Sequence, residues 1–180
     1  MTKVLFVTLP LLIFLSGLSL QAQNRIQWEE EVKLTWKDFK GKPMPTNHKV
    51  AATNYEIGYK YWMENNEFKF KVTCEFVKDL SWVAPIGKSD YILKHEQKHF
   101  DLAEVYARKL RKAFNEGDIT IKNYKRQIKS IYNQIWEECQ AAQAQYDDES
   151  HHSIDTRAQE KWDLLIDAQL EQFEAYKKDL

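Results

Sequence analysis

The sequence predicts an α+β domain, because its first half has the periodicity of strands and its second half that of helices. Apolar and polar residues nearly alternate through 55–61 and again through 68–76, which is typical of half-buried strands. The polar stretch 64–67 between them predicts a hairpin loop. Farther along the chain, apolar residues recur every three or four positions over three segments. We therefore expect N-terminal antiparallel strands packed against three C-terminal helices.

The three helices are expected at about 89–115, 120–145 and 155–177. Gly117 ends the first, and Ser153 or Asp155 caps the third. The inward stripe of the first helix is predicted to consist of Ile92, His95, His99, Leu102, Tyr106 and Leu110. Its opposite, polar side is predicted to carry Lys94, Gln97, Asp101, Arg108 and Arg111.

Residues 1–22 have the pattern of a secretory signal peptide. Lys3 precedes an apolar run over 4–20, and Ala22 is a small residue at a suitable cleavage position. The alternative is an uncleaved anchor, but the run is slightly short for a membrane span and contains Pro10. We expect cleavage after Ala22, a single domain over 23–180, and a periplasmic or extracellular location.

Charge and hydropathy restrict the partners of this chain. Its formal net charge is −1, with 26 basic and 27 acidic residues. A nucleic-acid-binding domain needs a basic excess, so no nucleic-acid partner is expected. No second apolar run has membrane length, so we expect no stable membrane span after cleavage. The sequence leaves the oligomeric state open.

The chain has two cysteines, Cys74 and Cys139. An even number of cysteines in an exported protein favours a disulfide. A bridge between these two would close a long loop and stabilise the fold by about 4 kcal/mol in the chain-entropy model. The alternative is a pair of buried thiols.

The strongest functional signal is the pentad 95–99, which reads His-Glu-Gln-Lys-His. His95 and His99 are four residues apart on a predicted helix, so both imidazoles project from one face and can share a metal ion. This HExxH spacing is the motif of zinc metallopeptidases, in which the glutamate, here Glu96, is the general base. The alternative is two buried histidines satisfied by hydrogen bonds. The pentad predicts a Zn²⁺ site.

A catalytic zinc ion needs a third protein ligand. The metzincin extension would place glycine and histidine where this chain has Leu102 and Val105, so that form of the motif is excluded. The polar segment 146–153 between the second and third helices offers two histidines. The candidates that remain are His151, His152, Glu137, Glu138 and Glu149. His48 is expected to be an ordinary surface residue.

The chain resembles a bacterial family of predicted secreted zinc-dependent proteases, which is described as a domain of unknown function with a zincin-like HExxH site. The resemblance rests on the pentad with its neighbours and on a later tyrosine-aspartate segment. The matching residues are Leu93, His95, Glu96, His99, Ala103, Glu104, Tyr146, Asp147, Glu149, His152, Gln159 and Trp162, and the resemblance also covers residues 36–39 and 81–83. It implies His152 as the third metal ligand. Ser150 and Ser153 depart from the family, which has threonine and glycine there.

Two residues near the predicted ligands, Tyr146 and Asp147, are candidates for supporting roles. Asp147 is a candidate acceptor for the second N–H of a ligand histidine, and Tyr146 is a candidate donor to the oxyanion of a tetrahedral intermediate. For each residue a plain core or helix-end role is the alternative.

The sequence thus predicts a secreted zinc metallopeptidase that acts on a protein or peptide substrate. Its metal ligands are His95, His99 and His152, and its catalytic residues are Glu96 and Tyr146. Two alternatives remain: a non-catalytic envelope module with a structural or vestigial zinc site, and a zinc amidase that acts on the cell wall.

Overall fold

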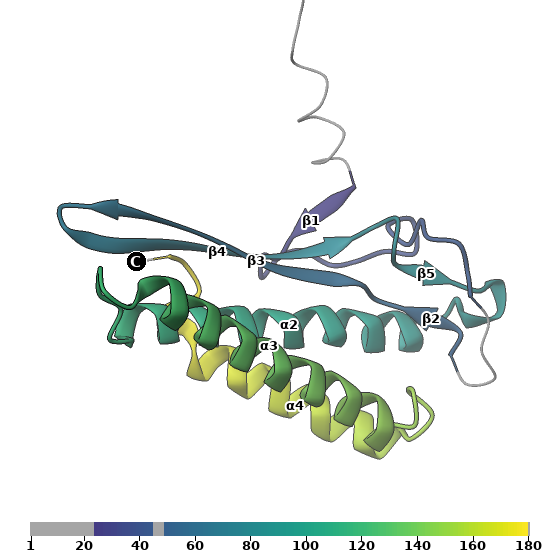
Figure 1. Ribbon diagram of the computed structural model, residues 1–180. Helices are drawn as coiled ribbons and strands as arrows, with labels where there is room; N and C mark the ends of the chain where they lie inside the picture. Colours follow the sequence, from purple (N-terminus) through teal and green to yellow (C-terminus); the bar gives the residue numbers. More distant parts are fainter. Residues whose placement is uncertain (1–23, 45–48, 180) are drawn as a thin grey trace, which may run out of the picture.

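The computed structural model describes residues 24–44 and 49–179. Strands come first in the chain and helices follow (Figure 1), which confirms the predicted α+β class. The strands are β1 (Arg25–Gln27), β2 (Ala51–Ala52), β3 (Tyr55–Glu64), β4 (Glu67–Val77) and β5 (Trp82–Val83). The helices are α2 (Asp90–Glu116), α3 (Tyr124–Glu149) and α4 (Thr156–Gln172), with short 3₁₀ turns η1 (Pro85–Gly87) and η2 (Glu174–Tyr176). The predicted signal peptide and His48 lie outside the described residues.

In the part of the chain that the structure describes, five strands form two small antiparallel sheets. β3 and β4 make a long hairpin from the pair Tyr55–Phe76 to the pair Glu64–Glu67, and β1 joins the free side of β4. The hairpin turn has Asn65 and Asn66 at φ of 50° and 63°, and asparagine is well suited to this left-handed region. β2 and β5 form a separate pair. The predicted hairpin is therefore confirmed.

Helix α2 lies between the strands and the other two helices (Figure 1). The Ser89 side chain caps its start by accepting from the Ile92 N–H at 3.2 Å, and the helix ends before Gly117. Phe100, Leu102, Val105 and Leu110 of α2 are all in the core. α2 is therefore covered on two sides, by β3 and β4 on one side and by α3 and α4 on the other.

The predicted polar side of the first helix is only partly exposed: Lys94 is exposed, whereas Asp101, Arg108 and Arg111 are buried. The side chains of Arg108 and Arg111 are only 1% and 5% exposed. Both pair with the buried Glu104 carboxylate, at 3.3 and 2.8 Å. Arg108 also donates to the Leu170 carbonyl of α4, and Arg111 donates to a carbonyl of β4. The charges are thus compensated between the layers, as buried charges must be.

The C-terminal end of α3 extends past the expected boundary, to Glu149. Ser150 follows as the C-cap, and its N–H donates to the Tyr146 carbonyl at 3.1 Å. Tyr146 and Asp147 are therefore helical and not part of a turn. The third helix begins as predicted, because Asp155 accepts from the N–H groups of Arg157 and Ala158.

Cys74 and Cys139 are free thiols, which differs from the predicted disulfide. Both are buried, Cys74 on β4 and Cys139 on α3. The Cys139 sulfur lies 3.6 Å from the Tyr55 hydroxyl and so already has a polar partner. Burial raises the pKa of Cys139 to about 11 and that of Cys74 well above its usual value. Both side chains therefore behave as small core residues.

None of the helices in 24–44 and 49–179 is long and apolar enough to cross a membrane.

Candidate metal centre

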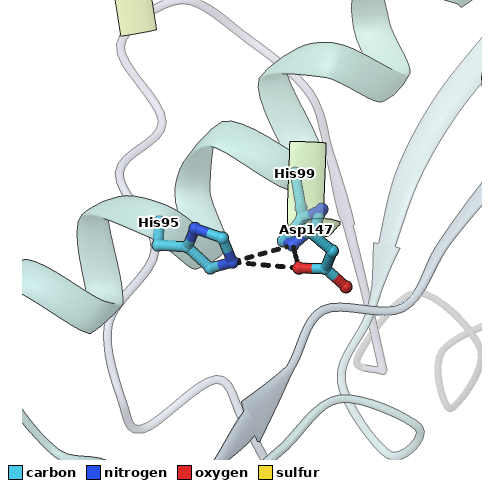
Figure 2. Close-up of side chains that lie close together, drawn as sticks. All are labelled: His95, His99 and Asp147. Carbon is cyan, nitrogen blue, oxygen red and sulfur yellow. Dashed lines mark hydrogen bonds and ion pairs between the residues drawn. The ribbon is translucent and has the colours of Figure 1, made fainter. Parts of the chain in front are cut away.

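His95 and His99 lie on the first half of α2, one helical turn apart, and both are largely buried. Their Nε2 atoms approach each other to 3.1 Å. The third member of the cluster is Asp147 on the last turn of α3. Its Oδ1 atom lies 3.2 Å from the Nε2 of His95 and 3.1 Å from that of His99 (Figure 2). Within 24–44 and 49–179, these three residues form a group that can hold a metal ion.

The spacing of the three atoms suits tetrahedral coordination. Metal-to-ligand bonds of about 2.0–2.1 Å, as for zinc with imidazole and carboxylate, separate the ligand atoms by roughly 3.3 Å. The three observed separations of 3.1, 3.1 and 3.2 Å are close to that value. One cation can therefore contact all three atoms with little movement of the side chains.

The other ring nitrogen of His95 shows which tautomer this histidine adopts. Its Nδ1 lies 2.7 Å from Oε1 of Gln159 on α4. The amide nitrogen of Gln159 donates to the Asp163 carboxylate at 2.7 Å, and Asp163 is itself paired with Lys94. Because a carboxylate in an ion pair only accepts, the Gln159 oxygen must face His95. His95 therefore carries its proton on Nδ1 and presents a lone pair at Nε2.

His99 is oriented in the same way by a residue of α3. Its Nδ1 lies 2.5 Å from Oε1 of Gln143, and the Gln143 amide nitrogen donates to the His99 backbone carbonyl at 2.9 Å. A carbonyl also only accepts, so the amide orientation is again fixed. Both histidines of the pentad thus direct an Nε2 lone pair towards Asp147.

Three electron-rich atoms at such short distances require a positive charge among them, either a metal ion or a proton on an imidazole. The pKa values of Asp147 and His99 are shifted in the directions that favour a negative carboxylate beside a positive charge. Burial alone would raise the pKa of Asp147, but hydrogen bonds with His95 and His99 hold it far below its ordinary value. Burial alone would lower the pKa of His99, yet the hydrogen bond to Asp147 and the charge of Glu96 raise it. The cluster is built to attract a cation.

Glu96, the predicted general base, lies between the two histidines in the pentad. It lines the same groove of about 460 Å³ as His95, His99 and Asp147. Its side chain is buried, with the residue 3% exposed, and within the described residues its Oε2 atom has no hydrogen-bond partner. The Glu96 backbone is held by the Thr53 hydroxyl, which donates to its carbonyl at 3.0 Å. An unsatisfied carboxylate oxygen beside a cation site fits a residue that receives a proton from a bound water.

The structure places His152, the predicted third ligand, next to Asp147 but not within the three-residue group. Its Nδ1 lies 3.2 Å from the Asp147 Oδ1 atom, without the alignment of a hydrogen bond. It stands in a turn where His151, His152 and Ser153 have φ values of 49°, 51° and 72°. Three successive non-glycine residues in the left-handed region are costly, and such strain gathers at functional sites. Ser153 occupies the position where the resembled family has glycine, the residue that this φ favours.

Asp147 differs from its predicted role. Asp147 does not accept the second ring N–H of a ligand histidine. That N–H is at Nδ1, where the acceptor is Gln159 for His95 and Gln143 for His99. Asp147 instead meets the two nitrogens that face the cation. Its other oxygen, Oδ2, is paired with Lys49 at 2.5 Å. Asp147 is thus better placed than His152 to be the third ligand.

Tyr146 is turned away from the groove. Its hydroxyl donates to the His95 carbonyl at 3.4 Å and accepts from the Gln159 amide. Its ring stacks on His95, with centroids 4.6 Å apart, and meets His99 edge-on at 4.8 Å. Tyr146 therefore packs against both imidazoles and holds them in place. Its hydroxyl is already hydrogen-bonded on the side away from the groove.

The three glutamate candidates for the third ligand are exposed and point elsewhere. Glu149 accepts from the Trp162 indole at 2.8 Å, and Glu138 accepts from Gln134 at 3.0 Å. Glu137 is exposed on α3 and does not line the groove.

Sequence reasoning missed Gln143 and Lys49. Gln143 lies four residues after Cys139 and four before Asp147, so the inward stripe of α3 already contained a signal for it. Lys49 follows the Pro/Asn-rich loop and belongs to no motif, so nothing in the sequence marked it.

We expect Gln159→Leu to weaken zinc binding by about 10- to 100-fold, because His95 loses the acceptor that fixes its tautomer. Competition against a chromophoric chelator measures this directly. The control is Gln134→Leu, which removes an exposed glutamine of α3 and should leave the zinc affinity unchanged. Equal affinities in the two variants would contradict the role of Gln159.

Comparison with known proteins adds a family match. Neither the search of curated proteins nor that of solved structures gives a match. The matched segment, residues 86–153, contains α2, α3 and the turn with His152, and so all members of the metal cluster. Over that segment the chain is similar to a bacterial family described as "Bacterial protein of unknown function (DUF922)".

Proposed function

We propose that this protein is an exported zinc-dependent metallopeptidase with a zincin-like site, in which His95, His99 and Asp147 hold the metal and Glu96 is the general base. The observation that carries the proposal is that the amide oxygens of Gln159 and Gln143 meet Nδ1 of His95 and of His99. These contacts fix both imidazoles with Nε2 towards the Asp147 carboxylate, and the unsatisfied Glu96 lines the same groove. A site meant only to satisfy two buried histidines would have no need of three converging acceptors.

Zinc is the metal that this donor set favours. Two imidazoles and one carboxylate are typical ligands of catalytic zinc, which keeps a further position open for water or substrate. Calcium and magnesium prefer sites made of oxygen atoms alone. Bound zinc supplies a Lewis acid that polarises a carbonyl and makes water nucleophilic near neutral pH.

The side chains around the metal have separate tasks in hydrolysis. Glu96 accepts a proton from the attacking water and delivers it to the leaving amine, which is the general acid–base role. Lys49 fixes the second oxygen of Asp147, so that only Oδ1 faces the cation. The proposal that the enzyme is exported rests on residues 1–22.

Metal analysis of the purified protein tests the proposal. We expect one zinc ion per chain after gentle preparation, and hydrolysis of an unfolded protein such as casein that stops on chelation and returns when zinc is added. The control is the double variant His95→Ala/His99→Ala, which should contain no zinc and show no hydrolysis. A wild-type protein that binds no zinc, or a double variant that still cleaves casein, would refute the proposal.

A second candidate function is a closed, structural zinc site. It is favoured by one distance, the 3.2 Å between His152 Nδ1 and Asp147 Oδ1, since a small shift of the turn would bring a fourth ligand to the cluster. Structural zinc sites have four protein ligands, whereas catalytic sites keep one position open. The number of ligands therefore separates the two candidates.

A further inference from the structure

The groove beside the metal centre is much longer than the centre itself. One wall is a face of α3, where Trp136, Gln140, Gln143 and Asp147 follow one another at helical spacing. At 1.5 Å per residue, the distance from Trp136 to Asp147 is roughly 16 Å along the helix. The metal cluster occupies only the Asp147 end of this wall.

The opposite wall is the extended segment 49–55, which includes β2. It runs antiparallel to α3, because its two ends meet α3 in reverse order. Lys49 pairs with Asp147 at 2.5 Å, and the Tyr55 hydroxyl accepts from the Gln140 amide at 2.9 Å. The groove therefore has two walls that are fixed to each other at both ends.

The end far from the metal is aromatic. The rings of Tyr55 and Trp136 lie 6.2 Å apart, and Trp136 also stacks on Tyr132 at 6.4 Å. Both Tyr55 and Trp136 line the groove and remain partly exposed there. The Tyr55 hydroxyl is occupied by Gln140 and Cys139, and burial raises its pKa far above the ordinary value, so the residue stays neutral. What this end offers to a ligand is ring surface.

We propose that Tyr55 and Trp136 form a subsite for an apolar, preferably aromatic, side chain of an extended peptide whose cleaved bond lies at the metal. The inference rests on the proposed function in calling the bound peptide a substrate and in placing its cleaved bond at the metal. An extended chain advances about 3.3 Å per residue, so the wall spans roughly five residues. The subsite thus recognises a residue about three to five positions away from the cleaved bond, and it selects peptides over short cell-wall amides with small side chains.

Binding of a peptide series to zinc-loaded Glu96→Gln protein tests the subsite without hydrolysis. The probes are capped alanine hexapeptides, each with one phenylalanine, moved through the six positions. Calorimetry should show one or two adjacent positions at which phenylalanine tightens binding by about tenfold or more over the all-alanine peptide. Absence of any such position refutes the subsite, and this comparison needs no variant of Trp136.

Three further variants in the same background show where the preference arises. Trp136→Ala should abolish the preference for phenylalanine, while Tyr55→Phe, which keeps the ring, should retain it. Trp62→Ala is the matched control, because Trp62 is exposed on β3 away from the groove, and it should change nothing. A preference that persists in folded Trp136→Ala protein also overturns the proposal.

Hydrolysis of the same peptides by wild-type protein separates this inference from the proposed function. Position-dependent binding without any cleavage supports the subsite and refutes the peptidase. Cleavage of all the peptides at equal rates, with no preference in binding, supports the peptidase and refutes the subsite.

Discussion

Replacing Glu96 with glutamine is expected to lower kcat for peptide hydrolysis by about 10²- to 10⁴-fold, the range contributed by a general base, while one zinc ion stays bound. Glutamine has nearly the same shape and fits the buried position, but its amide cannot accept the proton of water. Glu96 lies outside the three-residue metal group, so the ligands are untouched. The measurement is kcat and zinc content determined on one preparation.

The matched control for this variant is Glu138→Gln, an exposed glutamate of α3 that lies outside the groove. It should keep kcat within about twofold, as surface substitutions generally do little. If Glu96→Gln retains more than a tenth of the wild-type kcat with zinc in place, Glu96 is not the base. If it loses its zinc, Glu96 belongs to the ligands and the proposed division of roles is wrong.

The parts of the fold that follow from local periodicity were predictable from the sequence. Alternation placed the hairpin of β3 and β4 with its turn at Asn65 and Asn66, and the stripe beginning at Ile92 placed α2. These patterns depend on neighbours along the chain, so one sequence contains them in full.

What the sequence could not show is how many sides of α2 are covered. A helix with charges opposite an apolar stripe is normally solvated there. Here α4 covers that side, and Glu104 compensates Arg108 and Arg111 within the core. The periodicity of a sequence shows which residues share a face of a helix, but it does not show which other element packs against that face. The same limit applies to Cys74 and Cys139, whose pairing depends on the relative placement of β4 and α3.

The residues of the candidate site fall into the same two groups: those placed by the spacing along one helix, and those placed by the packing of separate helices. His95, Glu96 and His99 come from one helix, so their spacing alone brings them to one face. Asp147 was recognised as part of the site, but its position on the last turn of α3 depends on that helix continuing to Glu149. Gln143 and Gln159 act through hydrogen bonds from α3 and α4, and such partners are visible only once the helices are packed.

The two candidates for the third ligand make opposite predictions. We expect Asp147→Ala to weaken zinc binding by more than about 100-fold, beyond the range found when a group behind a ligand is lost. Asp147 Oδ1 is within 3.2 Å of both ligand nitrogens, whereas His152 reaches the cluster only through Asp147. His152→Ala should therefore cost less than about tenfold. Affinities from chelator competition give both numbers.

The neighbouring Asp148, which is exposed on α3, provides the control for Asp147: Asp148→Ala should leave zinc affinity unchanged. X-ray absorption on the wild-type protein gives an independent answer, because the Asp147 set contains two imidazoles and a set with His152 contains three. If His152→Ala is the more damaging variant and three imidazoles are found, His152 is the third ligand, as the family resemblance implies. If both substitutions are equally damaging and four protein ligands are found, the site is closed, and a structural role follows because no position is left for water.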